Sequence, residues 1–126
     1  MTKIGFIGLG NMGAKMTMNL LKANYEVIGY DINKEFVKKL LPKGLKQANN
    51  LSDIAEDTEI VITMLPNGDI VEEVYDNIVD EFAPGTLFVD CSTIEVNKAK
   101  QLHKKCEDKN VLSLEDRKST RLNSSH

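Results

Sequence analysis

The sequence is poor in aromatic residues, contains no tryptophan and only two cysteines, and lacks any long apolar run. No stretch approaches the roughly 20 consecutive apolar residues of a membrane-spanning helix, so we expect no membrane partner. Cys91 and Cys106 have neither a C-x-x-C spacing nor the spacing of a metal site, which predicts reduced structural thiols and no bound metal. A strand-like run begins at Lys3, where a leader peptide would stand, so we expect a cytoplasmic protein.

Arginine is absent from residues 1–115, which contain thirteen lysines and eighteen acidic residues. A net charge of −3 for the whole chain argues against nucleic-acid binding, which normally needs a clustered basic face. Both arginines, Arg117 and Arg121, lie in residues 116–126, a segment without apolar periodicity that resembles the translation of a sequencing-adapter oligonucleotide. We therefore expect a single domain over residues 1–115 and a non-native tail after it. The alternative is a genuine polar tail.

A glycine fingerprint is the most informative pattern in the chain. Gly8, Gly10 and Gly13 follow the apolar run 3–7, and apolar residues then recur at helical spacing as far as Ala23. The first glycine allows a tight turn, the second lets a pyrophosphate approach the backbone, and the third lets the helix pack on the strand. The start of the helix offers unpaired N–H groups to phosphates, so the pattern predicts a dinucleotide site. A glycine-rich turn without a ligand is the alternative.

Asp31 ends a second apolar run eighteen residues after Gly13. That distance is close to the spacing of about 20 expected for an acid that binds the adenosine ribose. Its carboxylate would repel a 2′-phosphate, and Lys34 is the only nearby cation, so we expect NAD as the cofactor and consider NADP less favoured. Asn33 can cap the next helix, and we expect it to belong to the same cofactor site as Asp31. The alternative makes Asp31 only a turn or capping residue ahead of Asn33.

Strand-like and helix-like segments alternate along the rest of the chain. Strands are predicted at residues 3–7, 27–30, 45–47, 59–65, 86–90 and 111–114. Helices are predicted at residues 11–23, 33–41, 52–56, 69–82 and 95–109. This alternation predicts an α/β fold, a Rossmann-type doubly wound parallel sheet with helices on both faces.

Ligands of such sheets bind outside the carboxyl ends of the strands. Leu65, Pro66 and Asn67 follow the fourth predicted strand, so we expect them at this binding edge. Ser92 and Thr93 follow the fifth, and there their hydroxyls would lie near a nicotinamide and its substrate. The alternative is that they cap the next helix. No histidine or lysine is close enough in sequence to activate a serine nucleophile, which argues against a hydrolase. His103, on a lysine-rich helix, is predicted to be solvated.

Three motifs in order, at residues 5–13, 64–67 and 90–94, resemble the β-hydroxyacid dehydrogenase family. That family includes 3-hydroxyisobutyrate dehydrogenase, and its cofactor domain is related to that of 6-phosphogluconate dehydrogenase. The resemblance implies that Leu65 and Pro66 line the adenosine side of the dinucleotide and that Thr93 lies by the nicotinamide. The residues expected to bind the cofactor are Gly8, Leu9, Gly10, Asn11, Met12, Gly13, Asp31, Asn33, Leu65, Pro66, Asn67 and Thr93, with Ser92 and Thr93 nearest the substrate.

Members of this family transfer a hydride between a nicotinamide and a 3-hydroxyacid, and a lysine in a second, all-helical domain is the acid and base. The resemblance ends at Glu115, before that domain and before the expected Ser-Gly-Gly substrate loop. We therefore expect a truncated cofactor domain that is inactive alone, from a homo-oligomeric enzyme with a small hydroxyacid substrate. The alternatives are an S-adenosylmethionine-binding methyltransferase domain and a non-catalytic NAD-sensing module.

Overall fold

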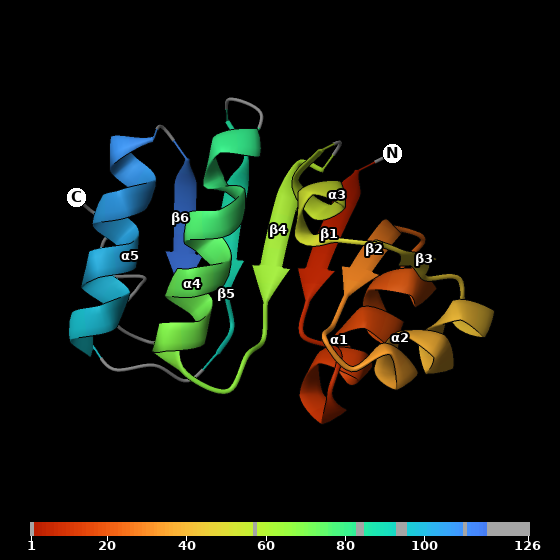
Figure 1. The fold of residues 1–126 in the computed structure, drawn as a ribbon. Helices are drawn as coiled ribbons and strands as arrows, with labels where there is room; N and C mark the ends of the chain where they lie inside the picture. The colour runs from red at the N-terminus through yellow and green to blue at the C-terminus, as the bar shows by residue number, and fades with distance from the viewer. Residues whose placement is uncertain (1, 57, 83–84, 93–95, 110, 116–126) are drawn as a thin grey trace.

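The computed structural model describes residues 2–56, 58–82, 85–92, 96–109 and 111–115. Its strands form one parallel sheet in the order β3-β2-β1-β4-β5-β6 (Figure 1). Their bounds are β1 (Lys3–Ile7), β2 (Glu26–Tyr30), β3 (Lys46–Gln47), β4 (Ile60–Thr63), β5 (Leu87–Asp90) and β6 (Leu112–Glu115). Strand order reverses between β1 and β4, because the chain builds outward from β1 to β3 and then from β4 to β6 on the other side.

Helices connect successive strands and cover both faces of the sheet, as the alternating pattern predicts. They are α1 (Asn11–Lys22), α2 (Lys34–Leu40), α3 (Leu51–Glu56), α4 (Gly68–Ile78) and α5 (Val96–Asp108), with short 3₁₀ turns η1 (Leu41–Lys43) and η2 (Val79–Glu81). No described helix has the length and apolarity that crossing a bilayer requires. The predicted doubly wound α/β class is confirmed.

Two apolar cores flank the sheet, and alternate residues of β1 enter them. Ile4 and Phe6 pack with Val37 and other residues of the α1 and α2 layer. Ile7 packs with Val71 and other residues of the α3, α4 and α5 layer. A strand buried on both faces carries apolar residues at successive positions, which explains the uninterrupted apolar run in the sequence.

The fourth strand is shorter than its β-branched run predicts. It ends at Thr63, whereas the prediction continued to Leu65. The backbone N–H of Leu65 donates to the Ser92 hydroxyl, 2.7 Å away, and Pro66 has no N–H to donate. Met64 still donates its N–H to the carbonyl oxygen of Ile7 in β1 at 2.9 Å, but it and Leu65 belong to the loop before α4. The other predicted elements lie within a few residues of their observed bounds.

Candidate functional site

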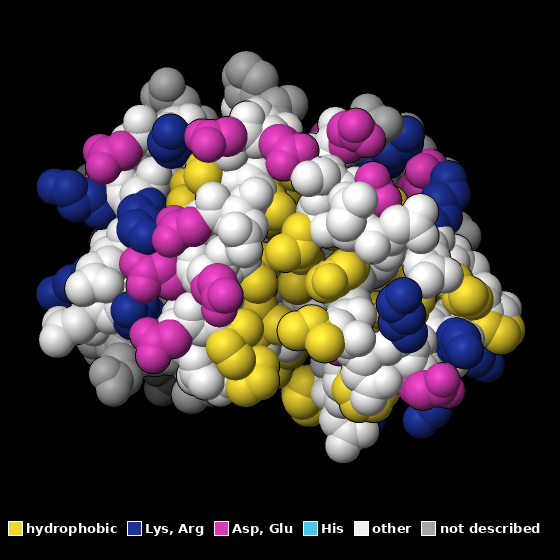
Figure 2. All heavy atoms as spheres, in the orientation of Figure 1, with side chains coloured by type: hydrophobic (Ala, Val, Ile, Leu, Met, Phe, Trp, Pro, Cys, Tyr) yellow, Lys and Arg dark blue, Asp and Glu magenta, His cyan; other side chains and the backbone are white. Residues whose placement is uncertain are grey.

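A cleft of about 700 Å³ opens at the carboxyl ends of β1, β2 and β4, next to the reversal in strand order. The glycine loop and the start of α1 form its floor, the end of β2 forms one side, and the β4–α4 loop with one side of α4 forms the other. Figure 2 shows apolar side chains gathered in a groove between α3 and α4 on this face. Open α/β sheets bind ligands at this position, so the cleft is the candidate site.

Strand register brings the predicted residues together. Ile7 pairs with Tyr30 on one side and with Thr63 on the other, so the residues that follow these three strands meet at one edge. The N–H of Gly8 donates to the carbonyl oxygen of Tyr30 at 3.0 Å, which ties the loop to β2. The parallel pairing thus places the glycine loop between Asp31 and the β4–α4 loop.

Two of the three fingerprint glycines are required by the fold. Gly8 has a φ of +100°, and a Cβ there would collide with the carbonyl oxygen of Met64. A Cβ on Gly13 would collide with the carbonyl oxygen of Gly8, so only glycine lets α1 pack this closely against the loop. These two residues explain the local shape of the loop.

Gly10 differs, because neither its conformation nor its packing demands glycine. Its φ of −71° suits any residue, and a Cβ would meet only the ring of Phe36, 3.9 Å away. Gly10 and Phe36 both line the cleft. A side chain at residue 10 would therefore occupy space that the folded protein leaves open, as expected where a pyrophosphate approaches the backbone.

Helix α1 begins at the floor of the cleft with its first-turn N–H groups available. Gly10 is its N-cap, so no side chain caps the helix there, and the first turn carries no acidic residue. Asn11 and Met12 line the cleft together with the glycines. The unpaired N–H groups and the positive end of the helix dipole suit a phosphate, so the residues present fit a dinucleotide diphosphate.

Asp31 both shapes the site and faces it. One carboxylate oxygen accepts from the N–H of Leu9 at 2.7 Å and the other from the N–H of Asn33 at 2.8 Å. The turn role that was the alternative interpretation is therefore present. Asp31 also lines the cleft, and each carboxylate oxygen can accept a further hydrogen bond, so the ribose role stays compatible with the geometry.

Three predicted residues support the cleft without lining it. Leu9 is buried beneath the glycine loop. Asn33 caps α2 by accepting from the N–H of Glu35 at 3.0 Å, and Asn67 caps α4 by accepting from the N–H of Ile70 at 3.0 Å. Their side chains stabilise the helices that carry the walls. Among the other predicted residues in the described part, all except Ser92 line the cleft.

One wall of the cleft, which α4 provides, was not predicted from the sequence. Ile70, Glu73, Val74 and Asn77 all line the cleft and lie on one face of that helix. Their i, i+3, i+4 and i+7 spacing is a signal that could have found them. Ile32 was also missed; it lies at the cleft directly after Asp31 and is 87% exposed, an unusual position for an isoleucine.

Ser92, predicted to lie near the nicotinamide and the substrate, is held inside the protein, and its nearness to either ligand stays a prediction. Its side chain is buried, and its hydroxyl accepts from the N–H of Leu65 and does not line the cleft. Thr93, predicted to lie by the nicotinamide, is outside the described residues. His103 is exposed as predicted, but its Nδ1 lies 2.6 Å from the Ser113 hydroxyl and its Nε2 lies 3.4 Å from a Glu107 carboxylate oxygen.

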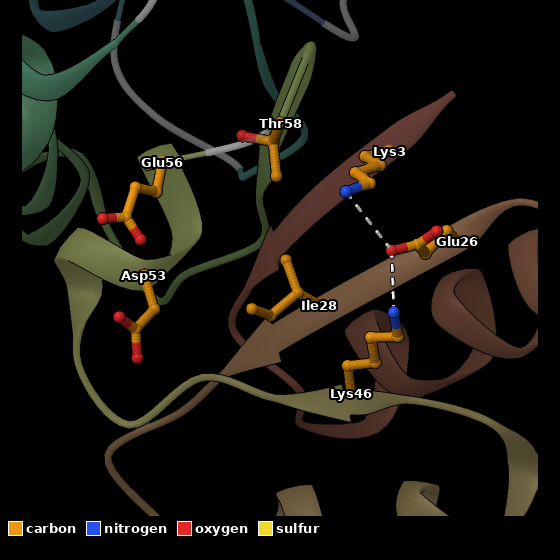
Figure 3. Close-up of a pocket in the computed structure, with 7 residues that line it drawn as sticks. All are labelled: Lys3, Glu26, Ile28, Lys46, Asp53, Glu56 and Thr58. Carbon is orange, nitrogen blue, oxygen red and sulfur yellow. Dashed lines mark hydrogen bonds and ion pairs between the residues drawn. The ribbon is translucent and has the colours of Figure 1, made fainter. Parts of the chain in front are cut away.

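A smaller pocket of about 240 Å³ lies at the opposite, amino ends of β1 and β2 (Figure 3). Glu26 pairs there with Lys46 at 2.8 Å and with Lys3 at 3.8 Å. The hydrogen bond from Lys46, with the positive charge of Lys3, holds the pKa of Glu26 below its ordinary value. Asp53 in the same pocket accepts from the backbone N–H of Asn49 at 2.9 Å. Three of the charged residues in this pocket, Lys3, Glu26 and Lys46, thus pair with one another.

A family model described as the NAD binding domain of 6-phosphogluconate dehydrogenase matches residues 3–116. The chain belongs to this family. The predicted resemblance to the dehydrogenases that share this domain is therefore confirmed.

Individual relatives of this NAD-binding domain are dehydrogenases and reductases. The mitochondrial 3-hydroxyisobutyrate dehydrogenase of Drosophila melanogaster is 43% identical over 107 residues, which are 84% of this chain and 33% of that protein. The 3-sulfolactaldehyde reductase of Escherichia coli is 41% identical over 97 residues, 75% of this chain and 33% of that protein. A solved structure of Mycobacterium tuberculosis 3-hydroxyisobutyrate dehydrogenase with L-serine has a TM-score of 0.89 and 36% identity, covering 91% of this chain and 40% of that one. The chain thus spans a third to two fifths of these relatives.

Proposed function

We propose that this NAD-binding domain serves a dehydrogenase that transfers a hydride between NAD and a small 3-hydroxyacid. The observation that carries the proposal concerns Gly10. The fold does not require glycine at this position, whereas a ligand that approaches the backbone there would require it. It lies beside the uncapped start of α1 and the carboxylate of Asp31, so one cleft offers a phosphate site and a ribose acceptor.

The preference for NAD over NADP follows from the surroundings of Asp31. A 2′-phosphate on the adenosine ribose would lie against this carboxylate, and like charges repel strongly at short range. No arginine is present in residues 1–115 to bind that phosphate with two hydrogen bonds. Lys34 lines a small recess next to Asp31 and is the cation nearest to it in sequence, which is too little to reverse the preference.

The substrate class is inferred from the relatives, whose names specify a 3-hydroxyacid and a sulfonated aldehyde. Catalysis would require an acid and base outside the matched residues, in line with the second domain that the resemblance implies. We propose that residues 1–115 are the cofactor domain, that residues 116–126 are not part of it, and that the complete enzyme is a cytoplasmic homo-oligomer.

Fluorescence titration with NADH and NADPH tests the cofactor assignment on the 126-residue chain. We expect saturable NADH binding and about tenfold weaker NADPH binding, because NADPH would make one unfavourable charge contact. Gly10→Val should abolish NADH binding because its side chain fills the cleft, while the melting temperature stays near that of the parent. Stabilisation by S-adenosylmethionine and not by NADH would favour a methyltransferase and overturn the proposal.

A further inference from the structure

A chain of buried polar side chains joins the ends of β4 and β5. Thr63 and Asp90 are register partners, and the Thr63 hydroxyl donates to Oδ1 of Asp90 at 2.9 Å. The backbone N–H of Ser92 donates to the same oxygen at 3.0 Å. Thr63 is completely buried, and Asp90 and Ser92 are each only 5% exposed. These contacts fix the turn after β5 against the end of β4.

The chain of hydrogen bonds continues to the wall of the cleft. The Ser92 hydroxyl accepts from the N–H of Leu65, 2.7 Å away and 27 residues earlier in the sequence. Leu65 and Pro66 line the cleft directly, while Ser92 lies behind them. The position of this wall therefore depends on a serine that is held by Asp90.

Burying these groups is costly, and the fold alone gives no reason for it. A buried carboxylate loses its hydration, and within the described residues nothing donates a hydrogen bond to Oδ2 of Asp90. Apolar residues would cover the ends of the two strands at a lower cost. Satisfied polar groups, in contrast, define one geometry for a loop, which an apolar contact does not.

We infer that Asp90 and Ser92 are positioning residues that hold the β4–α4 loop as a wall of the cofactor cleft. This assigns Ser92 to the support of the cofactor site, a role that was not expected from the sequence. The inference rests on the proposed cofactor function, because a fixed position of the β4–α4 loop matters for binding only if a cofactor contacts that loop.

Cofactor titrations on the 126-residue chain test this with matched variants. Ser92→Ala and Asp90→Ala should each weaken NADH binding about tenfold, the effect of losing one or two buried hydrogen bonds. Ser92→Thr and Asp90→Asn keep the accepting oxygens and should stay within about twofold of the parent. Thr58→Val is the control, since it removes a buried hydrogen bond of 2.6 Å to the Ile54 carbonyl at the amino end of β4.

Thr58→Val should lower the melting temperature about as much as Ser92→Ala while leaving NADH affinity unchanged. Equal NADH affinity in Ser92→Ala and the parent, or an equal loss in Thr58→Val, would overturn the inference. Hydrogen exchange of the Leu65 amide in the ligand-free chain gives a separate answer. We expect faster exchange in Ser92→Ala and Asp90→Ala and unchanged exchange in Thr58→Val. If the parent binds no NADH, the proposed function fails, and retained Leu65 protection in Ser92→Ala would overturn the positioning role independently.

Discussion

The two ends of the same parallel strands use their polar groups in different ways. At the amino ends, Glu26 is paired with both Lys3 and Lys46, so charges are neutralised within the protein (Figure 3). At the carboxyl ends, Asp31 accepts two backbone hydrogen bonds and still faces an open cleft, and α1 starts without a side-chain cap.

The comparison shows how a binding site differs from a merely charged surface. More charged residues line the small amino-end pocket than the cleft, and three of them, Lys3, Glu26 and Lys46, pair with one another. The cleft has few charges, an apolar wall and polar groups with spare capacity, as ligand sites usually have. Substitutions at Gly13, Asp31 and Glu26 test this contrast.

The largest effect is expected at Gly13, where the carboxyl-end loop is packed most closely. Gly13→Ala would place a Cβ against the carbonyl oxygen of Gly8, so the loop or α1 must shift. We expect a loss of about 3 kcal/mol in the free energy of unfolding, typical of severe overpacking, measured by urea denaturation. Gly10→Ala is the control and should leave stability nearly unchanged. Equal stability of the two variants would show that the loop is not packed as described.

A smaller effect is expected at Asp31, and it should appear in binding. Asp31→Ala removes the proposed ribose acceptor and should weaken NADH binding by about 1.5 to 3 kcal/mol, as measured by calorimetric titration. Asp53→Ala at the amino-end pocket removes a similar carboxylate that also accepts one backbone hydrogen bond. NADH affinity should stay at the parental value in that control. A loss of affinity at Asp53 equal to that at Asp31 would remove the contrast between the two ends.

The smallest effect concerns Glu26 and its dependence on pH. Because its pKa in the folded protein lies below the ordinary value of 4.5, its pairing stabilises the fold above that pH. The contribution is lost as the pH falls through the lowered pKa. Melting temperatures of the parent and Glu26→Gln should therefore differ slightly at neutral pH and converge in acid, with NADH affinity equal at neutral pH. A difference that grew in acid would have the wrong sign.

The sequence predicted the site best where local geometry decides it. The spacing of Gly8, Gly10 and Gly13 requires only a strand, a turn and a helix, and all three lie where predicted. The role of Asp31 was predicted from its spacing in sequence from the glycines. This spacing is informative because a single helix connects the two adjacent parallel strands. Thr93 stays a prediction, since it lies outside the described residues.

Prediction was poorer where a residue has a distant partner. Ser92 was expected near the substrate or as a helix cap, and its hydrogen bond with Leu65, which joins the ends of the adjacent strands β4 and β5, was not foreseen. This hydrogen bond and Pro66 both lie in the loop that follows the observed end of β4 at Thr63. His103 is exposed as predicted, but its contact with Ser113 on β6 could not be inferred from the sequence of its own helix.

The amino-acid pattern was sufficient to predict the order of strands and helices, the turn at the first and third glycines, and a dinucleotide as the ligand. These follow from backbone conformation and from apolar periodicity, which act over a few residues. The wall that α4 supplies and the contacts of Asp90 and Ser92 that hold the loop become visible in the folded chain alone. Such properties depend on strand register and packing between distant segments, because a hydrogen bond forms only when folding brings its donor and acceptor within about 3 Å.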